Sequence, residues 1–91
     1  SGWISTAGKG LRWTYGKAQV SAQWRQIPGG NVGCWFFKYG YGWPPEIDVV
    51  EAPGYHSGKY QVNAHWNTGN GNQNSWKYTN VSNIGSAYNR Y

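Results

Sequence analysis

Residues 46–51 read EIDVVE, and this short run holds all three acidic residues of the 91-residue chain. Acidic side chains are poor strand formers, and three of them close together repel one another. A solvated polar face would account for a pair of acids, but less well for three interleaved with Ile47, Val49 and Val50. The run follows Trp-Pro-Pro and ends at Ala-Pro-Gly, so it is predicted to be one strand that carries a chemical site.

The spacing of the three acids has a geometric meaning on a strand. Side chains alternate between the two faces, so Glu46 and Asp48 share a face, and Glu51 would fall on the other one. One β-bulge between Asp48 and Glu51 would return Glu51 to the shared face. A retaining glycosidase needs two carboxyl groups about 5–5.5 Å apart across the bond that it cleaves. The run is therefore predicted to be bulged and to present carboxyl groups suited to such chemistry.

Outside the acidic run, strand patterns alternate with turns. Residues 15–26 (YGKAQVSAQWRQ) alternate strictly, with Ala18, Val20, Ala22 and Trp24 on one face. Further strands are predicted over 32–37, buried on both faces, over 60–66 and over 75–79, with turns or loops at 27–31, 38–45 and 67–74 and no clear signal over 80–91. Five strands in a turn-rich chain indicate an all-β fold, part of a β-sandwich or jelly roll of antiparallel strands.

Composition and charge narrow the classes of function. Fourteen Gly, seven Trp and eight Tyr favour short strands and aromatic surfaces over helices. The single cysteine, Cys34, excludes an internal disulfide framework and is predicted to be a buried, inert thiol.

With only two isolated histidines there is no metal-ligand spacing, so neither a metal nor another cofactor is expected. No apolar stretch is long enough to span a membrane, and no membrane partner is expected. The net charge of +5 gives a weak preference for anionic partners.

The run EIDVVE resembles the E-x-D-x-x-E signature of glycoside hydrolase family 16, in the bulged branch that includes laminarinases, agarases, porphyranases and κ-carrageenases. The surroundings are similar too: Tyr15-Gly16-Lys17 before an alternating strand, GCWFF at 33–37, and His65-Trp66 on the neighbouring strand. The resemblance covers roughly residues 12–67. It implies a concanavalin-like jelly roll and a secreted, extracellular, endo-acting hydrolase of β-glycans. The implied substrate is β-1,3-glucan or a marine galactan. The excess of basic residues leans toward anionic galactans such as carrageenan or porphyran, and neutral β-1,3-glucan is an equal alternative.

By this resemblance, Glu46 is the nucleophile and Glu51 the general acid/base of a retaining double displacement. Asp48, between them, is expected to hydrogen-bond Glu46 and to help set the two protonation states. One carboxylate must be ionised to attack, while the other must be protonated to assist the leaving group. Because three acids so close together do not all ionise at low cost, at least one pKa is expected to rise.

Aromatic residues near the acids are candidates for sugar binding. Trp35 is expected to stack on a sugar ring, by similarity to the family's subsite Trp. Trp43 and Trp66 are candidates for the same role, with burial in the core an equal alternative. His65 is either a helper beside the acids or a structural residue. Three other indoles are expected to be structural: Trp13, Trp24 and Trp76.

The length of the chain raises the question of what completes the domain. The family's catalytic domain is more than twice as long, so residues 1–91 are expected to be its N-terminal and middle portion. A half-sandwich would expose long strand edges and a sheet face, so a complementary polypeptide is expected as a partner.

Two rival functions come from other classes of protein. The first is a catalytically silent, lectin-like sandwich, although a pure binder has no need of both Glu46 and Glu51. The second is a nucleic-acid module of the OB or cold-shock type, which needs a stacking platform free of acids. Here three acids crowd the richest aromatic region. A polysaccharide is therefore the expected partner, and nucleic acid is not.

Overall fold

A computed structural model describes residues 2–38, 40 and 42–91. Over this part of the chain the structure consists of strands without a helix, and the strands are β1 (Ser21–Ala22), β2 (Asn31–Phe37), β3 (Glu46–Pro53), β4 (Lys59–Thr68), β5 (Gly71–Asn80) and β6 (Asn89–Arg90). Every strand pair is antiparallel, which confirms the predicted all-β class. The described residues contain no helix of the length and apolar character that a membrane crossing requires.

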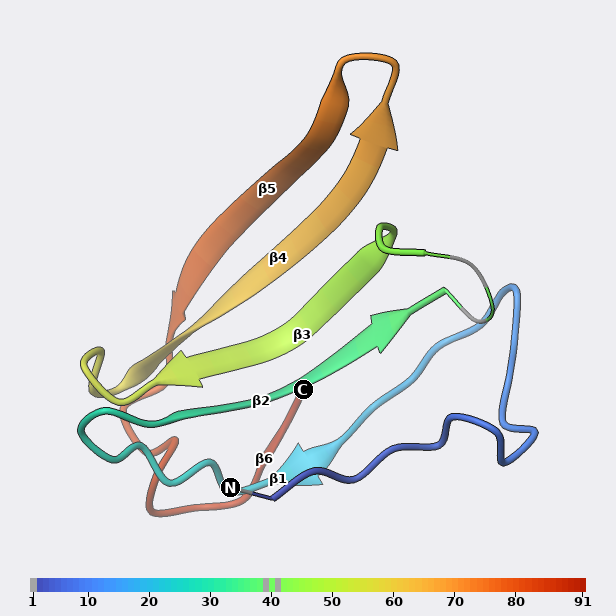
Figure 1. Ribbon diagram of the computed structural model, residues 1–91. Helices are drawn as coiled ribbons and strands as arrows, with labels where there is room; N and C mark the ends of the chain where they lie inside the picture. The colour runs from blue at the N-terminus through green and yellow to red at the C-terminus, as the bar shows by residue number, and fades with distance from the viewer. Residues whose placement is uncertain (1, 39, 41) are drawn as a thin grey trace.

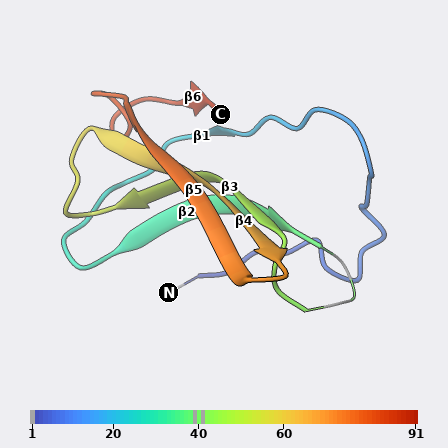
Figure 2. The same cartoon turned by 90° about the horizontal axis from the view of Figure 1, so that it is seen from above.

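The strands form two layers of unequal size. One sheet has the order β2-β3-β4-β5, and β1 pairs with β6 in a second, two-stranded sheet. The four long strands form a curved and twisted layer (Figure 1), and a view from above shows β1 and β6 lying over one side of it (Figure 2). We call the side of the large sheet that faces β1 and β6 the inner face. The fold is thus a β-sandwich of jelly-roll type, as predicted.

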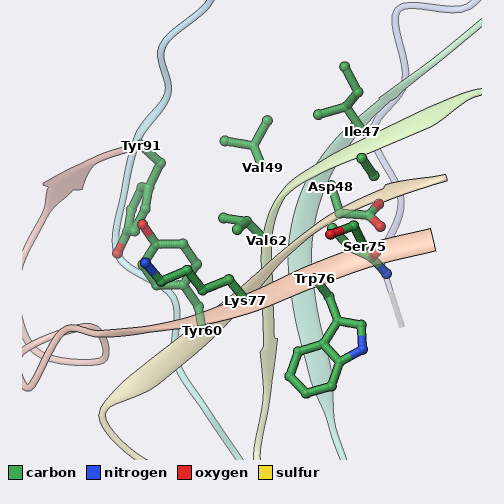
Figure 3. A pocket seen from close by; sticks show the side chains of 11 residues that line it. Ile47, Asp48, Val49, Tyr60, Val62, Ser75, Trp76, Lys77 and Tyr91 are labelled. Atoms are coloured by element: carbon green, nitrogen blue, oxygen red, sulfur yellow. The ribbon is translucent and has the colours of Figure 1, made fainter.

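The core lies between the two layers and is small. Val50 and Ala52 on the inner face of β3 are fully buried, and Ile84 from the segment before β6 packs on them. Around this cluster lie the partly buried side chains of Trp24, Val32, Val49, Tyr60, Val81 and Tyr91. Next to the core, an apolar hollow of about 570 Å³ opens on the inner face over β3, β4 and β5 (Figure 3).

The strand predicted over 15–26 is shorter than expected. Only Ser21–Ala22 is paired as a strand, although Val20 also exchanges two backbone hydrogen bonds with Tyr91, at 3.1 and 2.9 Å. Residues 15–19 are exposed and have no strand pairing, because a ladder needs a partner strand at hydrogen-bonding distance. The predicted alternation of faces does hold further along, where the inward-facing side chains are those of Val20, Ala22 and Trp24.

The prediction that residues 32–37 are buried on both faces is wrong. The strand itself is confirmed as β2, but β2 is an edge strand of the large sheet, and Phe36 and Phe37 are exposed. Cys34 is half-buried instead of fully buried. Burial still raises the pKa of the Cys34 thiol above its ordinary value, so the thiol stays protonated and unreactive at neutral pH.

The hairpin between β4 and β5 is tighter than the loop predicted over 67–74. Thr68 pairs with Gly71, which leaves a two-residue turn at Gly69-Asn70, a composition typical of tight hairpins. From this turn the pairing continues without interruption to Lys59 and Asn80. The strand predicted over 75–79 is therefore confirmed as part of a longer one.

The β-bulge predicted in the acidic run is confirmed. Asp48 pairs with Asn63 and Glu51 pairs with Gln61, so three steps along β3 face two steps along β4. The register also shifts on the other side, opposite β2. The extra residue returns Glu51 to the face that carries Glu46 and Asp48. We call this side of the large sheet, opposite the inner face, the acidic face.

Gly33 gives the bulge the space that it needs. A Cβ atom at this position would lie 2.4 Å from the carbonyl oxygen of Val50, a backbone atom of the bulged segment. We expect Gly33→Ala to lower the free energy of unfolding by about 3 kcal/mol, because a fixed backbone atom has little freedom to move away. Urea unfolding of the wild type and the variant measures this difference. Gly69→Ala is the control, since a Cβ there meets nothing within 4 Å. Equal unfolding midpoints for the two variants would contradict the close approach.

Candidate active site

The acidic face brings the predicted acids together at the centre of the large sheet. Its cross-strand rows run from β2 through β3 to β4, and they are Phe37–Glu46–His65, Trp35–Asp48–Asn63 and Gly33–Glu51–Gln61. Because the rows are in register, side chains from all three strands point to the same side of the sheet. The three acids are thus held in place by backbone pairing within the sheet.

Asp48 is the most enclosed of the three acids, at 4% exposed. Its Oδ2 atom lies 3.1 Å from Nε2 of His65, and that nitrogen also lies 3.0 Å from Nδ2 of Asn63. A proton on Nε2 would be donated to the Asp48 carboxylate in a charge-assisted hydrogen bond. His65 therefore lies directly beside the acids and holds the central one in place.

Glu46 lies next to Asp48 and is hydrogen-bonded to it. Its Oε2 atom accepts a hydrogen bond of 2.5 Å from Nε1 of Trp43. Burial raises the pKa of Glu46 first, and the hydrogen bond and the charge of Asp48 raise it further, while Trp43 and His65 act in the opposite sense. A hydrogen bond between two carboxyl groups requires one proton, so Glu46 keeps its proton to higher pH than an isolated glutamate does. The expected rise of one pKa among the three acids is found here.

Glu51 lies on the other side of Asp48 along β3. Its Oε2 atom accepts a long hydrogen bond, 3.4 Å, from Nε2 of Gln61. All three acids border one hollow of about 460 Å³, whose lining also includes Trp3 and Trp35. Among the described residues, no group of three or more His, Cys, Asp or Glu side chains is arranged to hold a metal ion.

Three of the four residues predicted to contact substrate lie at this site. Trp35 is opposite Asp48, and its ring packs edge-on against Trp3 with the centroids 4.8 Å apart. Trp43 is 54% exposed, and its ring lies 5.2 Å from that of His65. Both indoles thus have a face or an edge near the acids, where a sugar ring would lie.

Trp66, the fourth residue, is not brought to the acids. It follows His65 on β4, and the pairing of β4 with β5 is regular at this point. Successive side chains on a strand point to opposite faces, so Trp66 lies on the side of the sheet away from Glu46 and His65.

Trp76 was expected to be structural, but the structure places it on the acidic face. It pairs with Asn63 and is 57% exposed. The signal that would have found it is the Gly-Asn pair at residues 69–70. Once a two-residue turn is set there, counting along the two strands puts Trp76 opposite Asn63.

Two carboxyl groups on either side of a third, buried one, in a hollow bordered by aromatic rings, suit the binding of a sugar chain and the acid–base cleavage of a glycosidic bond. The fold and the site together therefore define an all-β protein whose acidic face is suited to a glycan ligand. Residues 4–91 match the family model of glycosyl hydrolases family 16, and the chain belongs to this family. Membership indicates glycan-hydrolase activity in general. Comparison with curated proteins and with solved structures gave no match.

Proposed function

We propose that this protein is a retaining, endo-acting hydrolase of β-glycans that works outside the cell and belongs to the bulged branch of the family. The observation that carries this proposal is the bulge that places Glu46, Asp48 and Glu51 on one face. The proposed substrate is β-1,3-glucan or a marine galactan of the agar, porphyran or carrageenan type. The aromatic lining of the hollow beside the acids supports a sugar polymer as the ligand.

In the proposed first step, the carboxylate of Glu46 attacks the anomeric carbon of the sugar. The bond from that carbon to the leaving oxygen breaks, and the carboxylic acid of Glu51 gives its proton to this oxygen. The product is a glycosyl ester on Glu46 and a shortened glycan chain with a new hydroxyl group.

In the proposed second step, a water molecule takes the place of the departed chain. The Glu51 carboxylate accepts a proton from this water, whose oxygen attacks the anomeric carbon and releases Glu46. Two displacements at one carbon retain its configuration. The sheet supports both steps because Glu46 and Glu51 are fixed on the same strand on opposite sides of Asp48.

Asp48 and Trp43 have proposed roles as positioning residues. Asp48 hydrogen-bonds Glu46 and His65, and thus fixes the orientation of the nucleophile. The indole N–H of Trp43 donates to Glu46 and favours its ionised form, which is the form that attacks.

The pH profile tests the role of Asp48. Glu46 attacks only when ionised, so its raised pKa places the acid limb of kcat/KM at higher pH than an ordinary glutamate would. Asp48→Asn removes a negative charge and a carboxyl–carboxyl hydrogen bond, both of which raise that pKa. We therefore expect the acid limb of the variant to move to lower pH, measured as kcat/KM against pH. A limb that stays in place or moves to higher pH would contradict this role.

The reaction and the substrate are tested together by measuring the release of reducing ends. The polymers are laminarin, mixed-linkage β-glucan, agarose, porphyran and κ-carrageenan, and the Glu46→Gln variant is assayed beside the wild type. Cleavage of one polymer that disappears in the variant is the expected result, and proton NMR of the first product then reports whether the configuration is retained. Binding of a polymer without any cleavage would instead favour a glycan-binding sandwich.

A further inference from the structure

The cross-strand row that contains Asp48 continues beyond the acids to the edge of the sheet. Trp35 on β2 pairs with Asp48, Asp48 pairs with Asn63 on β4, and Asn63 pairs with Trp76 on β5. The row therefore crosses β3 between Glu46 and Glu51 and has an indole ring near each end. Neighbouring strands lie about 4.8 Å apart, so three strand spacings separate the two Trp backbones by about 14 Å.

The ring of Trp76 stands on a packed base. Tyr78, two residues further on β5, lies 5.4 Å from it between ring centroids, at an interplanar angle of 69°. Tyr78 is held in turn by the ring of His56, at 4.9 Å, and by the ammonium group of Lys59, 5.4 Å from the ring centre. The rings of His56 and Tyr78 are half-buried, whereas Trp76 is exposed. This packing restrains the indole on one side and leaves it open on the other.

The exposed indole does not belong to the core. Trp76 and Lys77 leave β5 on opposite sides, as alternation along a strand requires, and the ring of Trp76 points away from Lys77 (Figure 3). A large aromatic ring in water gains nothing for folding from its exposed area. Its place on the acidic face, in the row through Asp48, gives it access to whatever binds there.

The direction of a bound glycan follows from the positions of the acids. The two carboxyl groups of a retaining glycosidase flank the bond that breaks, and Glu46 and Glu51 follow one another along β3. A chain whose bond lies between them must cross the strands instead of running parallel to them. The row from Trp35 to Trp76 is this crossing direction.

We propose that Trp76 is a further glycan-binding residue, a stacking platform on β5 for the apolar face of a pyranose unit in the same β-linked chain that is cleaved over β3. The inference rests on the proposed function. It extends the binding surface two strands beyond the acids, on the side of β3 opposite Trp35, and the sugar that stacks there lies away from the scissile bond.

The test separates polymer binding from bond cleavage. Trp76→Thr keeps a residue suited to a strand, and it is expected to raise KM for the cleaved polymer about tenfold with kcat almost unchanged. Cleavage of a short aryl β-glycoside, which occupies only the site over β3, should stay at the wild-type rate. Trp76→Tyr should recover most of the polymer KM. Lys77→Thr, on the opposite face of the same strand, is the matched control and should leave polymer KM unchanged.

Two further measurements keep the inference separate from the proposed function. The affinity of the Glu46→Gln protein for the same polymer, measured by calorimetry, should fall about tenfold when Trp76→Thr is added. Urea midpoints of the Trp76 variants equal to that of the wild type would show that folding is intact. A wild type that cleaves the polymer, with the same KM and affinity in Trp76→Thr, would overturn the platform and leave the proposed function standing. If no polymer is cleaved, the proposed function fails, and the calorimetry alone decides whether Trp76 binds glycan.

Discussion

Replacing Glu46 by Gln is expected to lower kcat on the cleaved polymer about 10⁴-fold or more, because an amide does not form the glycosyl ester of the proposed reaction. Gln has nearly the same shape as Glu, and its side-chain oxygen is still able to accept the hydrogen bond of Trp43. Polymer affinity should therefore change little while turnover is lost. Initial rates of reducing-end release, with calorimetric binding on the same samples, measure the two effects separately.

A chemical rescue distinguishes loss of the nucleophile from general damage to the site. In Glu46→Ala, the space of the missing carboxylate admits a small anion such as azide, which would attack the anomeric carbon of an activated aryl glycoside. The carbon–oxygen bond to the aryl group breaks, and the product is a glycosyl azide of inverted configuration. Retention of more than a tenth of wild-type turnover in Glu46→Gln, or an azide product of retained configuration, would show that Glu46 is not the nucleophile.

Replacing Glu51 by Gln is expected to lower kcat on the polymer about 10²- to 10⁴-fold, the usual contribution of a general acid. The loss should depend on the leaving group. The dinitrophenolate group of an activated aryl glycoside leaves as a stable anion and needs no proton. The first step on such a substrate should therefore proceed at nearly the wild-type rate in this variant. The second step still lacks its base, so the glycosyl ester should accumulate and give a burst of phenolate in pre-steady-state kinetics.

Glu46→Gln is the control for this pattern, because losing the nucleophile should abolish the burst for every leaving group. An equal loss of the first-step rate in Glu51→Gln on polymer and dinitrophenyl substrates, with no burst, would argue against proton transfer by Glu51. Gln61→Ala, which removes the long hydrogen bond to Glu51, should have a much smaller effect on both substrates.

The acidic face was predictable because its information is local. In EIDVVE, Glu51 is an odd number of residues from Asp48, so the three acids share a face only if the strand contains one extra, bulged residue. The pairing of Asp48 with Asn63 and of Glu51 with Gln61 shows this bulge. The role of Gly33 was harder to predict from the sequence, because the carbonyl that approaches it belongs to Val50 on a neighbouring strand.

Other features depend on which strands become neighbours. The apolar run at 32–37 indicated a central strand, yet the sheet order places β2 at an edge, where its exposed phenyl rings lack a neighbouring strand. In the alternating run at 15–26, backbone hydrogen bonds to other described segments occur only in the C-terminal part, where residues 84 and 89–91 lie beside it. Trp66, for which sugar binding and burial were equal alternatives, lies on the face opposite His65 because side chains alternate along β4. Trp76, expected to be structural, lies on the acidic face because the two-residue turn sets the register of β5 against β4.

The bulge in β3 also bears on how the gene tolerates the loss of a codon. An in-frame deletion of the codon for Val49 or Val50 would leave EIDVE, in which plain alternation already puts all three acids on one face. Deletion of the codon for Ile47 would instead put Glu46 and Asp48 on opposite faces. Loss of one of these two valines would thus shorten the strand by one residue in a single mutational event and still leave the three acids on one face.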